Sequence, residues 1–455
     1  MAFYNRDRYA MEDKQLSHAR VRDEKGSFGR SRTPDRSKYT YAESRDDLSS
    51  HFAASDTWFQ SVPTIDESEE DVESKASSTE GKISQRRVLY TSFGETPSKI
   101  MYIEKSDKLP KIKSPTDVLV RVEASTVSLH DSCLRRGLDM EVSNPVSLPG
   151  TPGADIVGTI QDCGDFQKLE NEYGLQQGTR VAALIRHGGN ARYIVVPSSS
   201  LVKVPRSVKA ADAACMVSPF MAAYQAMQLA TGKAYFSLQG KKILVIGGAG
   251  PIGQAIIQMA HRARASLIFA TAPLGCHKYV KKNLKSTPIP MESEEWLPLI
   301  RGKMDVVFDS ACADGTYDTS RAALSDRGTL VCVGLYGYLE RQQRGMFGAP
   351  LSAHWARIKS EHFMSNTVVS NLWKSFKHDP EKYKKDLLFL FELLKRNEIK
   401  PTIAKRVALC QVGNAQTYLE KGKNLGSIVC MPWKKPPVAG AEGSLEKRES
   451  SIGHY

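Results

Sequence analysis

Several features that define membrane, secreted or metal-binding proteins are missing from this sequence of 455 residues. It has no run of about 18 apolar residues, so no membrane-spanning helix is predicted. The opening stretch MAFYNRDRYAMEDKQL lacks the apolar segment of a secretory signal. The eight cysteines are scattered, and no two lie within three residues of each other. We therefore expect buried, reduced thiols, no sequence-local zinc site and a cytoplasmic location.

The net charge of +13 is distributed unevenly along the chain. Residues 1–45 carry +4 and residues 46–84 carry −8, so +17 falls on residues 85–455. A basic globular part can attract nucleic acid, an anionic membrane, or an anionic cofactor or substrate. Because the basic residues form no array with aromatic residues, we expect no nucleic-acid binding.

Both ends of the chain have the composition of disordered tails. Residues 1–84 include RSRTPDRS and TIDESEEDVESKASSTEGK, which are rich in charge and serine. Such segments bury too little apolar surface to offset the entropy lost on ordering. We expect disordered tails at 1–84 and 435–455, and the first tail is a candidate for binding protein partners.

The pattern of apolar residues changes within the region between the tails. Short β-branched runs over residues 86–198, bounded by Gly, Pro and Asp, predict a small barrel-like β domain. From residue 242 onwards, strand and helix patterns alternate, which indicates βαβ units and a parallel sheet. Within that part we expect helices over 252–263, over 319–328 and over a segment ended by Pro401.

The stretch KILVIGGAGPIGQ contains the pattern G-x-G-x-x-G at Gly248, Ala249, Gly250, Pro251, Ile252 and Gly253. It follows an apolar strand and opens a helix, which is the context that a dinucleotide-binding turn requires. The first glycine permits the tight turn, the second lets the backbone approach a pyrophosphate, and the third lets the helix pack on the strand. The helix N-terminus would then hold the phosphates. An ordinary glycine-rich loop is the alternative.

The end of the next strand bears on the choice between NAD and NADP. NAD sites usually place Asp or Glu there, on the ribose hydroxyls. This strand ends at Thr271 and Ala272, with no acid, and His277 and Lys278 follow. We therefore expect NADP, used as NADPH. The alternative is that Lys278 only begins a solvated helix face.

Five further motifs lie on either side of the glycine turn in a fixed order along the chain. They are VEASTVSLHDSCLRRG, LPGTPGADIVGTI, GTRVAALIRHGGNARYIVVP, GTLVCVGLYG and IKPTIAKRVALCQVGNAQTYLEKGKNLGSIV. With them, residues 86–434 resemble the medium-chain dehydrogenase/reductase superfamily, in particular its zinc-free branch similar to quinone oxidoreductases. The chain departs from that branch at Pro251, where glycine is usual, and at His261, where Lys or Arg is usual.

The resemblance implies an α/β fold with a GroES-like β-barrel catalytic domain split around a Rossmann domain with a doubly wound parallel sheet. The expected parts are residues 85–214 for the first part of the catalytic domain, 215–365 for the NADP-binding domain and 366–434 for the return to the catalytic domain. It also implies a homodimer and a cleft between the domains.

The resemblance also bears on the chemistry. The zinc enzymes use Cys at the position of Ser128 and His-Glu at Ala154 and Asp155, and their four-cysteine lobe is missing here, so we expect no metal. In the zinc-free branch, NADPH delivers hydride to an electrophilic small molecule, namely a quinone or the C=C bond of an α,β-unsaturated carbonyl compound. Gly334 and Leu335 would then touch the nicotinamide.

The expected substrate pocket departs from the branch. Ser128 stands where Asn is frequent, and Ala222 stands where Thr is frequent. We name Ser128, His130 and Tyr224 as candidate catalytic residues, with a surface or core histidine and a core tyrosine as alternatives. The leading hypothesis is an NADPH-dependent quinone or enone reductase. The alternatives are an NADPH-binding regulatory or interaction protein and a zinc alcohol dehydrogenase.

Overall fold

The structure is a computed structural model, and it describes residues 84–138, 146–232, 237–313, 315–343, 366–422 and 424–435. Apart from residues 84 and 435, the expected tails lie outside the described residues.

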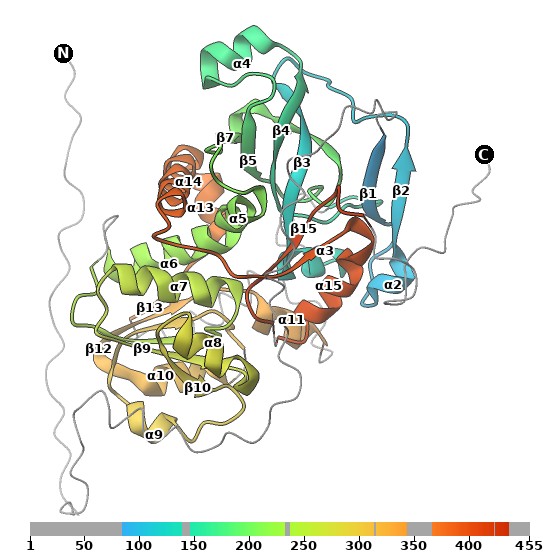
Figure 1. The fold of residues 1–455 in the computed structure, drawn as a ribbon. Coiled ribbons are helices and arrows are strands. Elements are labelled where there is room, and N and C mark those ends of the chain that lie inside the picture. Colours follow the sequence, from blue (N-terminus) through green and yellow to red (C-terminus); the bar gives the residue numbers. More distant parts are fainter. Residues whose placement is uncertain are drawn as a thin grey trace, which may run out of the picture. The chain divides into compact units, whose positions relative to one another are not determined.

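One sheet has six parallel strands in the spatial order β10-β9-β8-β11-β12-β13. Its strands are β8 (Lys242–Ile246), β9 (Leu267–Ala272), β10 (Thr287–Pro290), β11 (Met304–Asp309), β12 (Leu324–Cys332) and β13 (Thr367–Val369). The central strand β8 is buried over Ile243–Ile246 because helices cover both faces of the sheet (Figure 1). The chain winds one way from β8 to β10 and the other way from β11 to β13. The order therefore reverses between β8 and β11, where ligands of such sheets bind.

Short helices connect these strands. They are α7 (Pro251–Arg262), η4 (Leu274–Cys276), α8 (His277–Lys282), α9 (Leu297–Ile300), α10 (Thr316–Ala323) and α11 (Tyr336–Gln343). The helix expected over 319–328 is partly wrong, since α10 ends at Ala323 and Leu324 already begins β12. The sheet also extends past residue 365, the expected end of the NADP-binding domain, because β13 pairs with β12.

The other large sheet follows the order β14-β15-β3-β4-β5-β7, and β6 also pairs with β3. Its strands are β3 (Asp117–Val127), β4 (Asp155–Cys163), β5 (Arg180–Leu184), β6 (Tyr193–Pro197), β7 (Val202–Lys203), β14 (Ile403–Val407) and β15 (Ser427–Cys430). The last two strands come from the end of the chain, and β15 pairs with β3. A separate hairpin, β1 (Gln85–Tyr90) with β2 (Met101–Ser106), lies beside this sheet (Figure 1).

The remaining helices surround this sheet. They are α2 (Pro97–Ile100), α3 (Leu129–Arg135), α4 (Phe166–Tyr173), η2 (Ser198–Ser200), α13 (Leu372–His378), α14 (Pro380–Lys395), η5 (Leu409–Gln411) and α15 (Val412–Leu419). The helix α14 ends six residues before Pro401, because Asn397 adopts a positive φ of 56° just after its last turn. The prediction that Pro401 halts the helix was therefore wrong.

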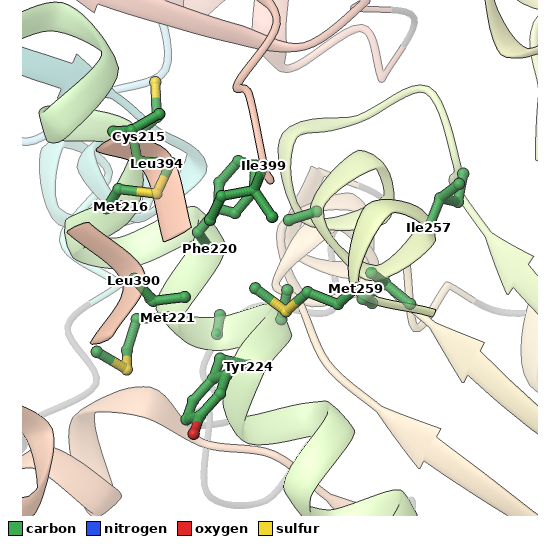
Figure 2. Close-up of a cluster of buried hydrophobic side chains, with 14 of the residues drawn as sticks. Cys215, Met216, Phe220, Met221, Tyr224, Ile257, Met259, Leu390, Leu394 and Ile399 are labelled. Carbon is green, nitrogen blue, oxygen red and sulfur yellow. The ribbon is translucent and has the colours of Figure 1, made fainter. Parts of the chain in front are cut away.

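One hydrophobic core joins the two sheets. A continuous helical segment runs through α5 (Ala210–Cys215), the π-helical turn η3 (Met216–Phe220) and α6 (Met221–Thr231). Its apolar side chains pack against α7 and α14, as Figure 2 shows for Phe220, Met259 and Leu390. Pro219 lies inside η3, which agrees with the wider turn, since proline cannot donate the helical hydrogen bond.

All eight cysteines are free thiols, and seven of them are buried, as the sequence predicts. Among the described helices, none combines the length and apolar character needed to cross a membrane.

Candidate functional site

The glycine turn joins β8 to α7 and is held by backbone hydrogen bonds. Gly247 has a φ of 76°, and its N–H donates to the Thr271 hydroxyl over 2.8 Å. The Gly248 N–H donates to the Thr271 carbonyl over 2.8 Å, and the Gly250 N–H donates to the Gly247 carbonyl over 3.0 Å. The turn is therefore tied to the end of the neighbouring strand β9.

The three motif glycines have different neighbours. A Cβ atom at Gly253 would lie 2.2 Å from the Gly247 carbonyl oxygen, and one at Gly248 would lie 2.6 Å from the Ala270 Cβ atom. At Gly250 the nearest atom would be 3.4 Å away. Gly248 and Gly253 thus serve the packing of turn, strand and helix, while Gly250 leaves the backbone open to an approaching ligand.

The N-terminus of α7 can accept an anion. Gly250 is its N-cap, Pro251 is its first residue, and no described side chain caps it. The Ala249 carbonyl is already used, because it accepts from the Gly426 N–H at 2.8 Å and from the Gln254 amide at 2.7 Å. The free N–H groups of the first turn and the helix dipole favour a phosphate at this point.

A cavity of about 530 Å³ opens at this turn. It lies at the carboxyl ends of β8, β11 and β12, beside the reversal of strand order. The parallel-sheet part contributes residues 246–247, 249–252, 310–311 and 333–336, together with Pro273, Met291, Ala313 and Thr316. The remaining lining residues are 126–130, Ala154, Ser218, Pro219, Ala222, 370–373, Leu419, Lys421, Gly422, Asn424 and Ser427.

Eight of the residues named from the sequence line this cavity: Ser128, His130, Ala249, Gly250, Pro251, Ile252, Gly334 and Leu335. Gly334 has a φ of 125°, and a Cβ atom there would lie 2.1 Å from the Ser310 carbonyl oxygen. The close approach of the loops after β11 and β12 therefore requires glycine.

Tyr224 does not line the cavity. Its side chain is buried on α6 in the hydrophobic core (Figure 2). Its ring centroid lies 5.7 Å from that of Phe389. Tyr224 follows Ala222 by two helical residues, so its side chain points away from the cavity that Ala222 lines. The structure thus corrects the choice of Tyr224 as a catalytic candidate.

The residues expected near a 2′-phosphate lie at the edge of the site and not in the cavity lining. Thr271 and Ala272 are buried, and Thr271 holds the glycine turn. The His277 Nε2–H donates to the Ala272 carbonyl over 3.0 Å. Lys278 is exposed on α8.

A carboxylate that sequence reasoning overlooked approaches the same edge. The Glu292 Oε1 atom accepts from the Leu274 N–H over 3.4 Å. Glu292 follows β10, so only the pairing of β10 with β9 brings it beside the end of β9. A carboxylate there repels a 2′-phosphate and can bind ribose hydroxyls.

Ser128 and Asp131 form a hydrogen-bonded pair at the cavity wall. The Asp131 Oδ2 atom accepts from the Ser128 N–H over 2.8 Å and from the Ser128 hydroxyl over 2.9 Å. Its Oδ1 atom accepts from the Gly153 N–H over 2.7 Å. Asp131 is fully buried, and this burial raises the pKa of its carboxyl to about 7 despite the three hydrogen bonds.

His130 packs against an aromatic ring from a distant segment. Its ring is stacked on Trp373, with centroids 5.1 Å apart and an interplanar angle of 29°. Its Nε2–H donates to the Arg186 carbonyl over 3.2 Å. These contacts hold the imidazole at the cavity wall.

The residues present do not fit a catalytic zinc ion. Ser128 and Ala154 are not practical zinc ligands. The Asp155 carboxylate already accepts from the Thr126 N–H (2.7 Å), the Thr126 hydroxyl (2.6 Å) and the Ser218 hydroxyl (2.7 Å). Within the described residues, no group of three His, Cys, Asp or Glu side chains is arranged to hold a metal.

Sequence reasoning also overlooked several lining residues. Met291, Asn371, Trp373 and Asn424 lie in loops or at a helix start, with no motif of their own. Lys421 is the one Lys, Arg, Asp or Glu in the described lining, and it lies in the EKGKNLG segment. The basic character of this segment, which returns to the β domain, was the only sequence feature that could have pointed to Lys421.

Comparisons with known proteins match this architecture. Residues 114–206 match the family model of the alcohol dehydrogenase GroES-like domain, and residues 289–430 match that of zinc-binding dehydrogenases. A synaptic vesicle membrane protein VAT-1 homolog-like of Mus musculus is 23% identical over 347 residues, which cover 73% of this chain and 79% of the relative. A 2-methylene-furan-3-one reductase of Solanum lycopersicum is 30% identical over 231 residues, which cover 49% of this chain and 55% of the relative.

A solved structure supports the fold. The quinone oxidoreductase from Coxiella burnetii has a TM-score of 0.60 at 20% identity, covering 77% of this chain and 99% of that one. The GroES-like and Rossmann parts predicted from the motifs are thus confirmed. The chain belongs to the medium-chain dehydrogenase/reductase superfamily, whose oxidoreductases bind a nicotinamide cofactor.

Proposed function

We propose that this protein is a zinc-independent, NADPH-dependent reductase of quinones or of the C=C bond of α,β-unsaturated carbonyl compounds. The observation that carries the proposal is one cavity shared by two groups of residues. The glycine turn and the α7 N-terminus line it on one side, and Ser128 and His130 line it on the other. A dinucleotide bound at the turn would therefore have its reactive end near these two side chains.

The lining suggests which residues would hold the cofactor. The N–H groups at the start of α7 would bind the pyrophosphate, and Gly250 would allow its close approach. Lys421 adds a positive charge to the same cavity. Gly334 and Leu335 would lie along the nicotinamide side. When bound, the cofactor supplies a hydride.

The substrate side of the cavity is apolar with a few polar groups. Leu129, Leu372 and Trp373 offer apolar surface, which excludes water and suits a flat quinone or enone. The Ser128 hydroxyl lies between the cavity and the buried Asp131 carboxyl. We infer that this pair holds a proton beside the oxygen or carbon that becomes negative after hydride transfer.

Titration of the full-length protein with NADPH and NADH, followed by addition of a quinone or an enone, tests the proposal. Ligand binding is followed by fluorescence, and turnover by the loss of NADPH absorbance. Tight NADPH binding with turnover of either acceptor supports the reductase. Absence of binding would contradict the assignment of the glycine turn. A zinc ion retained in stoichiometric amount, detected by metal analysis, would contradict the zinc-independent mechanism.

A second candidate is an NADPH-binding regulatory or interaction protein. The relatives named for synaptic vesicles and the small side chain of Ala222 at the cavity favour it. Binding of NADPH without turnover of either class of acceptor would support this candidate over the reductase.

A further inference from the structure

Two arginine side chains pack against the ring of Trp433, close to the start of β1. The Arg121 guanidinium lies 4.0 Å from the centroid of the Trp433 ring, and the Arg192 guanidinium lies 4.4 Å from it. All three side chains are partly buried. Together with Arg86 and Lys105, they are called the Arg–Trp cluster below.

Strand pairing builds the Arg–Trp cluster from five segments of the chain. Arg121 on β3 pairs with Tyr193, the residue after Arg192. The backbone N–H of Arg192 donates to the backbone carbonyl of Arg86 over 2.8 Å. Arg86 on β1 lies directly opposite Lys105 on β2. This register is a property of the fold, so the positive charges are held together.

Trp433 is fixed in the middle of these segments. Its indole N–H donates to the Val122 carbonyl over 2.8 Å, and its ring meets that of Tyr193 edge-on at 5.7 Å. The two arginines therefore share a rigid aromatic platform, which leaves guanidinium N–H groups to bind an anion.

The positive charge of the cluster is not neutralised by neighbouring acids. Glu123, two residues from Arg121 on the same face of β3, is paired with Arg180 at 2.9 Å. Glu104 is paired with Arg87. Within the described residues, none of the four cations of the cluster forms an ion pair with a carboxylate.

Like charges directly opposite on paired strands are destabilising, as for Arg86 and Lys105. The pKa of Arg192 is lowered, chiefly by burial and then by the charges of Arg86 and Arg121. An acidic partner would relieve this repulsion, so the cluster fits an acidic peptide.

The chain itself contains such a peptide in the sequence shortly before β1. Residues 66–80 hold seven Asp or Glu and one Lys. The chain then enters β1 at Gln85, whose side chain donates to the Tyr193 carbonyl over 2.7 Å. Five residues span up to about 17 Å, so the acidic segment joins the fold within reach of Arg192.

We propose that the Arg–Trp cluster binds the chain's own acidic segment, residues 66–80. A short tether gives an effective concentration on the order of 1 mM, so a contact with an intrinsic dissociation constant of about 1 mM is half occupied. A contact of this strength requires an ion pair at each of the four cations of the cluster, each near the strong end of the range for exposed pairs.

Quenching of a bimane dye by Trp433 tests this contact in the full-length protein. The dye is attached to a Val72→Cys variant in a Cys410→Ser background, since the other seven cysteines are buried. We expect Trp433→Phe to raise the emission about twofold, as half occupancy of a quenching contact implies. Trp58 lies near the dye in the sequence and can quench it as well. Because Trp58 is present with and without Trp433→Phe, the difference between the two proteins reports only the quenching by Trp433.

Charge variants show whether the contact is electrostatic. Neutralising the segment (Glu67, Glu69, Glu70 and Glu73 to Gln) should raise the emission as Trp433→Phe does, and this change leaves every described residue intact. The double variant Arg121→Gln and Arg192→Gln should raise the emission in the same way. The control variant Arg262→Gln and Arg301→Gln removes the same charge elsewhere and should leave the emission unchanged. In 1 M NaCl, where the Debye length is about 3 Å, the quenching should disappear.

Three results would overturn the proposal. The first is emission that Trp433→Phe does not change. The second is quenching that unlabelled protein dilutes, because then a second copy is the occupant. The third is binding of phosphatidylserine vesicles through Arg121 and Arg192 that the native segment does not compete with, because then the cluster serves a lipid surface.

Discussion

Asp131 shows how burial and hydrogen bonding oppose each other at a single residue. Three donors stabilise its charged form, yet the carboxyl is fully buried and its pKa rises to about 7. The largest cause is desolvation, and the nearby Asp155 adds a like charge. The native state therefore keeps a proton that the unfolded chain loses near its ordinary pKa of 3.8.

This difference predicts a pH dependence of stability. Between about pH 4 and pH 7 the native state binds more protons than the unfolded chain, so the free energy of unfolding falls as the pH rises. One proton contributes a slope of at most about 1.4 kcal/mol per pH unit. Urea unfolding of the wild type and of Asp131→Asn over this range measures it. The free energy of unfolding of the wild type should fall relative to that of Asp131→Asn as the pH rises, because only the wild type carries the titrating carboxyl. A difference that stays constant with pH would contradict the pKa assignment.

Two residues beside the end of β9 carry opposite charges, which gives opposite predictions for cofactor choice. Lys278→Glu should weaken NADPH binding at least about tenfold and spare NADH, because it replaces a positive charge by a negative one and each charge near a 2′-phosphate contributes on the order of 1 kcal/mol. Glu292→Gln should strengthen NADPH binding, because it removes a carboxylate beside the Leu274 N–H. Fluorescence titration with both cofactors measures each change. If Lys278→Glu affects both cofactors alike, Lys278 is only surface charge.

At the scale of elements, two glycines at the junction of β8 and α7 have different predicted roles, one in packing and one in ligand binding. Gly253→Ala places a Cβ atom against a backbone carbonyl, so we expect a loss of roughly 2–4 kcal/mol in stability. Gly250→Ala meets no atom closer than 3.4 Å, so the fold should tolerate it. Gly250 lines the cavity, so an added methyl group should hinder the pyrophosphate, and we expect cofactor affinity to fall at least about tenfold.

Thermal unfolding and NADPH titration of both glycine variants measure these effects. Gly94→Ala is the matched control, because its nearest neighbour would also be 3.4 Å away and it lies outside the cavity lining. Unchanged NADPH affinity in Gly250→Ala would show that the pyrophosphate does not approach this glycine.

At the scale of the whole molecule, the two sheets share one core. Buried residues of the β domain, among them Ala124 and Val157, belong to the same cluster as Ile243 and Val245 of the parallel sheet. We expect residues 84–435 to unfold in a single transition, with circular dichroism and tryptophan fluorescence changing together. Two separate transitions would show that the domains are independently stable.

The elements that were predicted well have strong local signals. The strand β8 is a continuous apolar run before glycines, and α7 follows a motif whose spacing specifies a turn. The boundaries that were wrong depend on longer-range pairing. The helix α10 ends before Leu324, because Leu324 pairs with Met304 of β11, and Thr329 and the residues up to Cys332 continue that pairing.

The sequence by itself determined the class of fold, the glycine turn and the family, because these depend on residue type and spacing along the chain. Only the tertiary structure decided that Tyr224 lies in the core, that Trp373 stacks on His130, and that Glu292 lies beside β9. It likewise gathered the Arg–Trp cluster from β1, β2, β3, the residue before β6 and the residues after β15. The physical reason is that strand pairing and helix packing join segments up to hundreds of residues apart, and no local pattern encodes those distances.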